Sequence, residues 1–88
     1  MKKIVVFTRA AEKSLLKIEQ RYQKAILGII DELTAWPQMP KNRDIVKLEG
    51  IEDTFRIRTG VYRVIIVAHG NSIIVTVLEI QKRKDAYK

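Results

Sequence analysis

The sequence contains no cysteine and only one histidine, His69. Without cysteine there can be no disulfide bond and no thiolate-bound metal, and one histidine cannot form a zinc-binding cluster. We therefore expect neither a metal nor a cofactor. No apolar run reaches the roughly 20 residues of a membrane span. The run that follows Lys2 and Lys3 ends at Arg9, too early for a signal-peptide core. These absences predict a cytoplasmic protein that does not contact a membrane.

The length of 88 residues predicts one domain, residues 1–88, with one core. Hydrophobic residues make up 47% of the chain and charged residues 31%, a balance that argues against intrinsic disorder. Lysine and arginine number 17 against 10 acidic residues, so the net charge is +7. Such a charge favours a nucleic acid or an acidic protein as partner, with a merely solvated basic surface as the alternative.

The first half of the chain predicts a strand followed by helices. Residues 3–8 are rich in β-branched residues and end at Thr8, a residue type that often caps helix N-termini. Apolar residues then recur at helical spacing as far as Leu33. A single helix of that length would be too long for so small a domain, so we expect a helical hairpin that bends near Gln20 to Tyr22. The Trp36-Pro37 pair is expected to end the helical region.

The second half predicts strands joined by short turns. A short extended segment is expected at 45–48, and longer strands at 55–59, 61–68 and 72–80, with glycine-containing connections typical of antiparallel neighbours. The last of these strands is apolar on both faces apart from Thr76 and Glu79, which predicts an interior position in the sheet. The expected fold class is α+β: an antiparallel, mixed-edge sheet with the helical hairpin on one face.

Three arginines are predicted to share the other face. Strand alternation separates Arg56 and Arg58 from the apolar residues beside them. If Thr59-Gly60 is a two-residue turn, Arg56 lies opposite Arg63. Like charges opposite each other are unfavourable unless an anion or a carboxylate lies between them, which suggests a phosphate-binding patch. Ordinary solvated arginines are the alternative interpretation.

The chain then ends in a basic tail, in which Lys82, Arg83 and Lys84 precede Tyr87. Because the preceding strand is expected inside the sheet, the tail would leave it close to the arginine patch. A solvated charged terminus is the plain alternative.

Several short blocks, in their order and spacing, resemble the RelE/ParE superfamily of bacterial toxins. They are Lys47-Leu48-x-Gly50, Phe55-Arg56-Ile57-Arg58, Gly60-Val61-Tyr62-Arg63-Val64-Ile65 and Lys82-Arg83-Lys84-Asp85-Ala86-Tyr87. The resemblance covers nearly the whole chain and implies a RelE-like fold. In this superfamily, RelE-type members cut mRNA in the ribosomal A site, whereas ParE-type members poison DNA gyrase.

The resemblance implies five catalytic residues and three that bind RNA. Arg56 and Arg58 match two positions that are commonly lysine in the RelE branch, Arg63 matches its sheet arginine, and Arg83 and Tyr87 match its C-terminal pair. Lys47, Lys82 and Lys84 are the candidates for contacts with RNA. An arginine stays protonated at any workable pH, so it can bind phosphate but cannot serve as a base.

The general base of such a reaction stays open. The resemblance gives this role to Tyr87, whose neighbours Arg83 and Lys84 would favour its ionised form. Asp44 and Glu49 are alternatives, because some relatives use a carboxylate upstream of the basic strand. His69 is expected in a turn at the far end of its strand from Arg63 and outside the site.

The predicted function is that of a metal-independent, ribosome-dependent mRNA endonuclease toxin. Its expected partners are the ribosome, mRNA and a cognate antitoxin protein that neutralises it. The alternatives are a ParE-like inhibitor of DNA gyrase and a basic RNA-binding module without catalysis.

Overall fold

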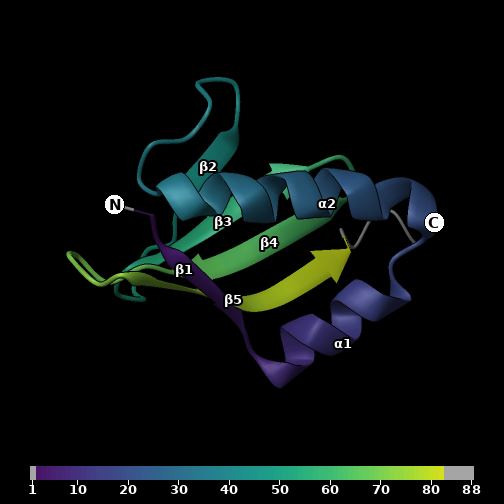
Figure 1. The fold of residues 1–88 in the computed structure, drawn as a ribbon, viewed down its shortest axis with the longest axis horizontal. Coiled ribbons are helices and arrows are strands. Elements are labelled where there is room, and N and C mark those ends of the chain that lie inside the picture. The colour runs from purple at the N-terminus through teal and green to yellow at the C-terminus, as the bar shows by residue number, and fades with distance from the viewer. Residues whose placement is uncertain (1, 83–88) are drawn as a thin grey trace.

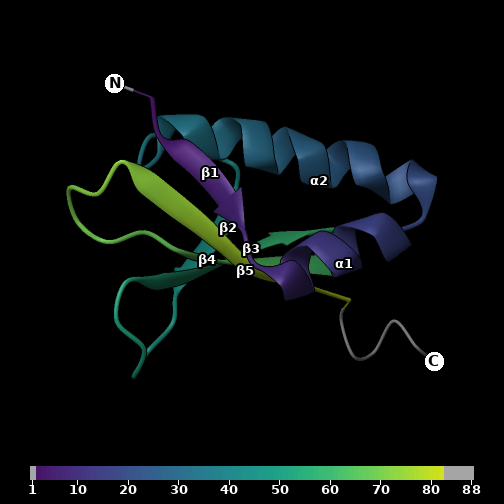
Figure 2. The ribbon, with the colours of Figure 1, turned by 60° about the horizontal axis from the view of Figure 1, so that its bottom comes forward.

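The computed structural model describes residues 2–82. The chain begins with strand β1 (Ile4–Phe7), followed by helix α1 (Arg9–Lys17), helix α2 (Gln20–Glu32) and the 3-10 turn η1 (Leu33–Ala35). Strands β2 (Asp44–Lys47), β3 (Thr54–Thr59), β4 (Tyr62–Val67) and β5 (Ile74–Lys82) complete it. The predicted α+β class is confirmed, and both helices lie on one side of the sheet (Figures 1 and 2).

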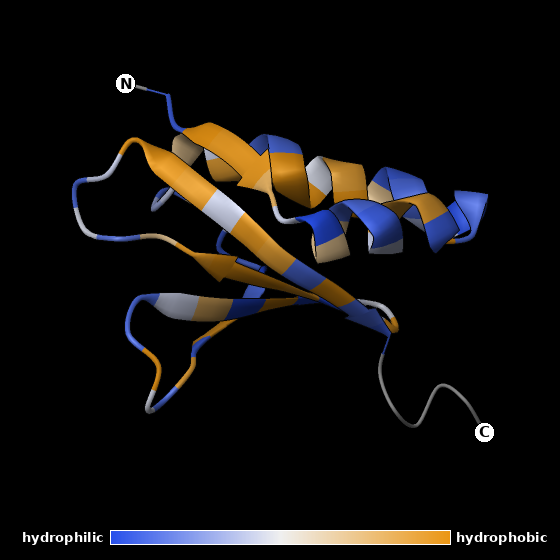
Figure 3. Cartoon of the chain, turned by 90° about the horizontal axis from the view of Figure 1, so that it is seen from below, coloured by the Kyte–Doolittle hydropathy of each residue, from blue (hydrophilic) through white to orange (hydrophobic). Residues whose placement is uncertain are grey.

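The five strands form one sheet in the order β1-β5-β4-β3-β2. The pairs β2–β3, β3–β4 and β4–β5 are antiparallel, whereas β1 runs parallel to β5 at the edge. The last strand is therefore interior, as its apolar sequence predicted. In Figure 3 the first part of β5 is hydrophobic and its last residues are hydrophilic, so the strand ends in a polar region.

Two helices replace one long helix because the chain leaves the helical conformation at Ile18. The side chain of Gln23 donates to the carbonyls of Leu15, at 3.3 Å, and Ile18, at 3.1 Å. These bonds satisfy acceptors that the end of a helix leaves free. Ile18 itself is buried. The predicted bend is thus confirmed, although it falls slightly before Gln20, and the helical region ends before Trp36 as expected.

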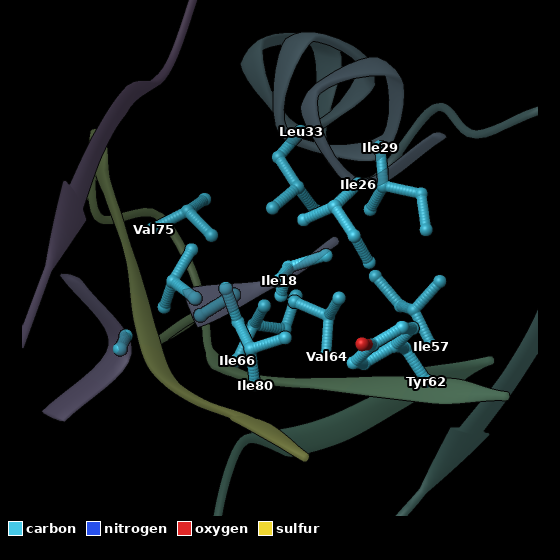
Figure 4. Packing of buried hydrophobic residues seen from close by; sticks show 13 residues of the cluster. Ile18, Ile26, Ile29, Leu33, Ile57, Tyr62, Val64, Ile66, Val75 and Ile80 are labelled. Carbon is cyan, nitrogen blue, oxygen red and sulfur yellow. The ribbon is translucent and has the colours of Figure 1, made fainter. Parts of the chain in front are cut away.

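One hydrophobic core lies between the helices and the sheet. Strand residues Ile57, Val64 and Ile66 are fully buried and face Ile26 and Ile29 of α2 (Figure 4). Aromatic pairs extend the packing at its margins: the Trp36 and Phe55 rings lie 4.8 Å apart, and those of Tyr22 and Tyr62 lie 5.5 Å apart. The two helices therefore cover one face of the sheet and leave the opposite face free of helices.

Within residues 2–82, no helix is long and apolar enough to cross a membrane. The same part of the chain holds no group of three or more histidine, cysteine or acidic side chains that could bind a metal ion.

Candidate functional site

The candidate site lies on the sheet face that is turned away from the helices, here called the open face. On β3, Ile57 is fully buried towards the helices. Arg56 and Arg58 alternate with it and therefore point to the open face. The sequence predicted this separation, and the burial along β3 agrees with it.

Arg63 joins them from β4, but with a different partner from the one predicted. The turn consists of Gly60 and Val61, so Arg58 lies opposite Arg63 and Arg56 lies opposite Ile65. The prediction placed the turn one residue too early. Gly60 has a φ of +55°, and hairpin turns that match strand twist need a positive φ at their first central residue, which favours glycine there. Since the shift keeps the parity, all three arginines still share the open face.

The carboxylate of Asp44 approaches the two arginines of β3. Asp44 faces Arg58 across the β2–β3 pairing. Its oxygens lie 3.6 Å from Arg58 Nε and 3.8 Å from an Arg56 terminal nitrogen. Both distances are long for a hydrogen bond, and half of the Asp44 side chain is exposed, so these ion pairs are loose. The sequence suggested that a carboxylate would offset the arginines but did not identify Asp44 in that position.

Two guanidinium groups keep unused donors. Arg56 Nε and Arg63 Nε are both buried and have no hydrogen-bond partner within residues 2–82. A buried donor without an acceptor carries an unrecovered desolvation cost, of about 1–3 kcal/mol. Each guanidinium also carries terminal nitrogens, and arginine presents these donors in a geometry that suits phosphate, so the group could bind an anion on the open face.

The strand pairings line up one transverse row across four strands: Asp44, Arg58, Arg63 and Gln81. A second row runs beside it: Val46, Arg56, Ile65 and Glu79. The first row follows from the observed register, and the place of Glu79 in the second depends on an irregularity in β5. Sequence reasoning missed both Gln81 and Glu79, because strand alternation alone places Glu79 on the other face.

Two of the predicted RNA-binding lysines lie apart from the arginines. Lys47 is opposite Phe55, and so on the other face of the sheet from Arg56. Lys82 is opposite Tyr62 and lines a hollow of about 230 Å³ together with residues of α1 and β5. The remaining predicted residues, Arg83, Lys84 and Tyr87, lie outside the described residues.

His69 lies away from this face. Its Nδ1 atom is 2.9 Å from a carboxylate oxygen of Asp53, in the region that follows β4, whereas Arg63 lies near the start of that strand. The prediction that His69 lies at the opposite end of its strand from Arg63 is confirmed.

Comparison with known proteins connects this geometry to a family. Residues 5–87 match the family described as the ParE toxin of the type II toxin-antitoxin system parDE. The chain belongs to the RelE/ParE toxin superfamily. The resemblance seen in the sequence is thereby confirmed. No curated protein matches the chain in sequence.

Solved RelE structures support the superfamily assignment through the fold. The RelE–RelB complex of Pyrococcus horikoshii contains a chain that is 27% identical, with a TM-score of 0.81 over 96% of this chain and 98% of that one. The RelB–RelE complex of Methanococcus jannaschii contains one that is 27% identical, with a TM-score of 0.76 over 93% and 94%.

The isolated RelE toxin of E. coli is 20% identical, with a TM-score of 0.77 over 97% of this chain and 90% of that chain, and shows the common fold alone. This RelE/ParE toxin thus matches a ParE family description by sequence and RelE toxins by structure.

Proposed function

We propose that this toxin is a ribosome-dependent mRNA endonuclease. The observation that carries the proposal is the group of three arginines on the open face, where Arg58 lies opposite Arg63 and Arg56 lies in the adjacent row. Guanidinium groups suit a phosphodiester, and the transition state of RNA cleavage carries additional charge on the same oxygens.

The proposed chemistry is attack of a ribose 2′-hydroxyl on the adjacent phosphorus. Arg56, Arg58 and Arg63 would bind the phosphate and stabilise its developing charge. Arg83 would donate a hydrogen bond to the leaving 5′-oxygen. The family resemblance suggests Tyr87 as the base, with Asp44 and Glu49 as alternatives. Lys47, Lys82 and Lys84 would contact RNA outside the reacting group. Arginines stay protonated and cannot accept the 2′ proton. The reaction would therefore also depend on the orientation of the mRNA in the site, which the ribosome would provide.

An antitoxin protein is the expected second partner. The archaeal RelE chains that resemble this one were solved in complex with RelB antitoxins. A net charge of +7 would favour an acidic or amphipathic segment of the antitoxin. Co-expression with a short acidic protein encoded next to the toxin should restore growth, and the two should copurify.

The endonuclease proposal is tested by inducing the chain in cells and mapping mRNA 5′ ends. Cuts are expected within translated codons, and Arg63→Ala, Arg83→Ala and Tyr87→Phe should each reduce them at least tenfold. Lys24→Ala, an exposed basic change on α2, is the matched control and should cut like the wild type. An absence of codon-linked cuts in cells whose growth has stopped would refute the proposal.

The second candidate is a gyrase inhibitor, and the ParE family match is the observation that favours it. It predicts supercoiling inhibition by purified toxin and a DNA-damage response, with mRNA left intact. The non-catalytic alternative predicts RNA binding without cleavage or growth arrest. One induced culture can distinguish the endonuclease, the gyrase inhibitor and the non-catalytic RNA-binding protein, because mRNA ends, the DNA-damage response and growth can be measured in the same cells.

A further inference from the structure

A β-bulge in β5 controls which residues reach the open face. Ile66 lies opposite Val77, yet the preceding residue Ile65 lies opposite Glu79, so Leu78 is an extra residue in β5. A bulge of this kind reverses the alternation of the strand beyond it. Without it, Ile80 would point to the open face and Glu79 would point into the core.

The observed burial agrees with this reversal. Val75, Val77 and Ile80 are all core residues, at a spacing that regular alternation does not allow. Glu79 is exposed and shares the open face with Ile65, its cross-strand partner. Bulges are frequent beside active sites, where they redirect a side chain. Here the redirected side chain is a carboxylate.

The bulge brings Glu79 within reach of a phosphate held by the arginines. Ile65 lies between Glu79 and Arg56 in one transverse row, and Gln81 is the partner of Arg63 in the next row. Diagonal neighbours in adjacent strands have Cα atoms about 7–8 Å apart, so Glu79 and Arg63 can contact the same nucleotide from two sides.

Glu79 also differs from Asp44 in its contacts. The Asp44 carboxylate lies beside Arg56 and Arg58, whereas Glu79 has no ion pair with any residue of the 2–82 range. A carboxylate that has no ion pair within residues 2–82 and lies one strand from Arg63 on the same face has lone pairs with which to accept a proton.

We propose that Glu79, in place of Tyr87, Asp44 or Glu49, is the general base that deprotonates the 2′-hydroxyl, an inference that rests on the proposed endonuclease function. As the bond from O2′ to phosphorus forms, the 2′ proton passes to the Glu79 carboxylate. The bond from phosphorus to O5′ breaks, and the leaving oxygen takes a proton from water. The products are a 2′,3′-cyclic phosphate and a 5′-hydroxyl, and Glu79 then returns its proton to solvent.

The test measures single-turnover cleavage of mRNA on programmed ribosomes by the full-length toxin. Glu79→Gln should lower the maximal rate by about 100-fold or more, the usual contribution of a general base. The toxin concentration that gives half of the maximal rate should change less than about threefold, and Glu79→Asp should recover part of the rate. Glu12→Gln, an exposed change on α1, is the matched control and should behave as the wild type.

The pH dependence separates a carboxylate base from a tyrosine. The ordinary carboxyl and phenol pKa values are about 4.3 and 10, so a carboxylate base gives a rate that is nearly flat from pH 6.5 to 8.5. A tyrosine base gives a rate that keeps rising with pH. Equal cleavage by wild type and Glu79→Gln, or a wild-type rate that rises tenfold per pH unit, would overturn the role of Glu79 alone. Failure of the wild type to cleave on ribosomes would overturn the endonuclease function as well.

Discussion

The Thr8 hydroxyl donates a hydrogen bond to the carbonyl of Leu78, the extra residue of the β5 bulge. The same oxygen accepts a hydrogen bond from the Ala11 amide, at 3.1 Å, as the N-cap of α1. The Thr8 side chain therefore stabilises both the N-terminus of α1 and the bulge in β5. The sequence predicted the cap but not the contact with the bulge.

Loss of the Thr8 hydroxyl should destabilise both features. We expect Thr8→Ala to lower the free energy of unfolding by about 2 kcal/mol, from a lost cap and an unpaired carbonyl. Thr8→Ser retains the hydroxyl and should lose less than half of that. Urea unfolding followed by circular dichroism gives both values. A Thr8→Ala variant as stable as the wild type would contradict this double role.

The direct pairing of Arg58 with Arg63 predicts a conflict between stability and function. Arg63→Gln removes one of two like charges that face each other, which should leave stability unchanged or raise it by about 0.5 kcal/mol. The same change should lower cleavage at least 100-fold, because an electrostatic contact to the phosphate is lost. Thermal melting and ribosome cleavage assays are the two measurements. A clear loss of thermal stability together with the loss of cleavage would indicate a structural role for Arg63.

Removal of the Asp44 carboxylate should strengthen RNA binding. Asp44 offsets part of the charge of Arg56 and Arg58 through loose ion pairs, which are individually worth about 0.2–1 kcal/mol. We expect Asp44→Asn to bind single-stranded RNA about two- to fivefold more tightly at 0.1 M salt, with a steeper salt dependence. Fluorescence anisotropy gives the affinity, and Asp31→Asn on the exposed side of α2 is the control. Weaker binding by Asp44→Asn would show that Asp44 orients the arginines instead.

The contact between Arg43 and Glu32 predicts an acid-sensitive contribution to stability. Two hydrogen bonds, of 2.7 and 2.8 Å, join the guanidinium to the carboxylate. They hold the pKa of Glu32 below its ordinary value of 4.5. The contribution is therefore present above the unfolded-state pKa and is lost as the pH falls through the lowered one.

We expect Glu32→Gln to cost about 1 kcal/mol of unfolding free energy at pH 7. The difference from the wild type should shrink as the pH falls below 4.5. Urea titrations at several pH values give this comparison, with Glu52→Gln, an exposed change in a turn, as the control. A difference that stays constant down to the lowest pH would rule out the ionised pair as its cause.

The elements that could be predicted from the sequence are those with a strong local signal. Helical spacing, the Thr8 cap and alternation in β3 gave the helices, the first strand and the face of Arg56. The register of β3 and β4 depended on which residues form the turn, and the positive φ of Gly60 is a conformational fact that its neighbours do not encode. A turn placed one residue early exchanged the partners of the arginines without moving them to another face.

The place of Glu79 could not be predicted, because a bulge leaves almost no trace in composition. Residues 73–80 are apolar apart from Thr76 and Glu79, so one extra apolar residue at Leu78 does not stand out in the sequence. Only the cross-strand pairing and the burial of Ile80 reveal the extra residue. The ion pairs of Asp44 were hidden for a related reason, since they depend on how a short edge strand aligns with β3.

The strand order also has a consequence during synthesis. Strand β5 lies between β1 and β4, yet it is the last of the described elements to be translated. Until it leaves the ribosome, β1 lacks its partner and the core lacks Val75, Val77 and Ile80. The nascent chain therefore cannot assemble the complete sheet, because β1 pairs only with β5 among the described strands. Folded toxin should therefore form only after β5 has been translated.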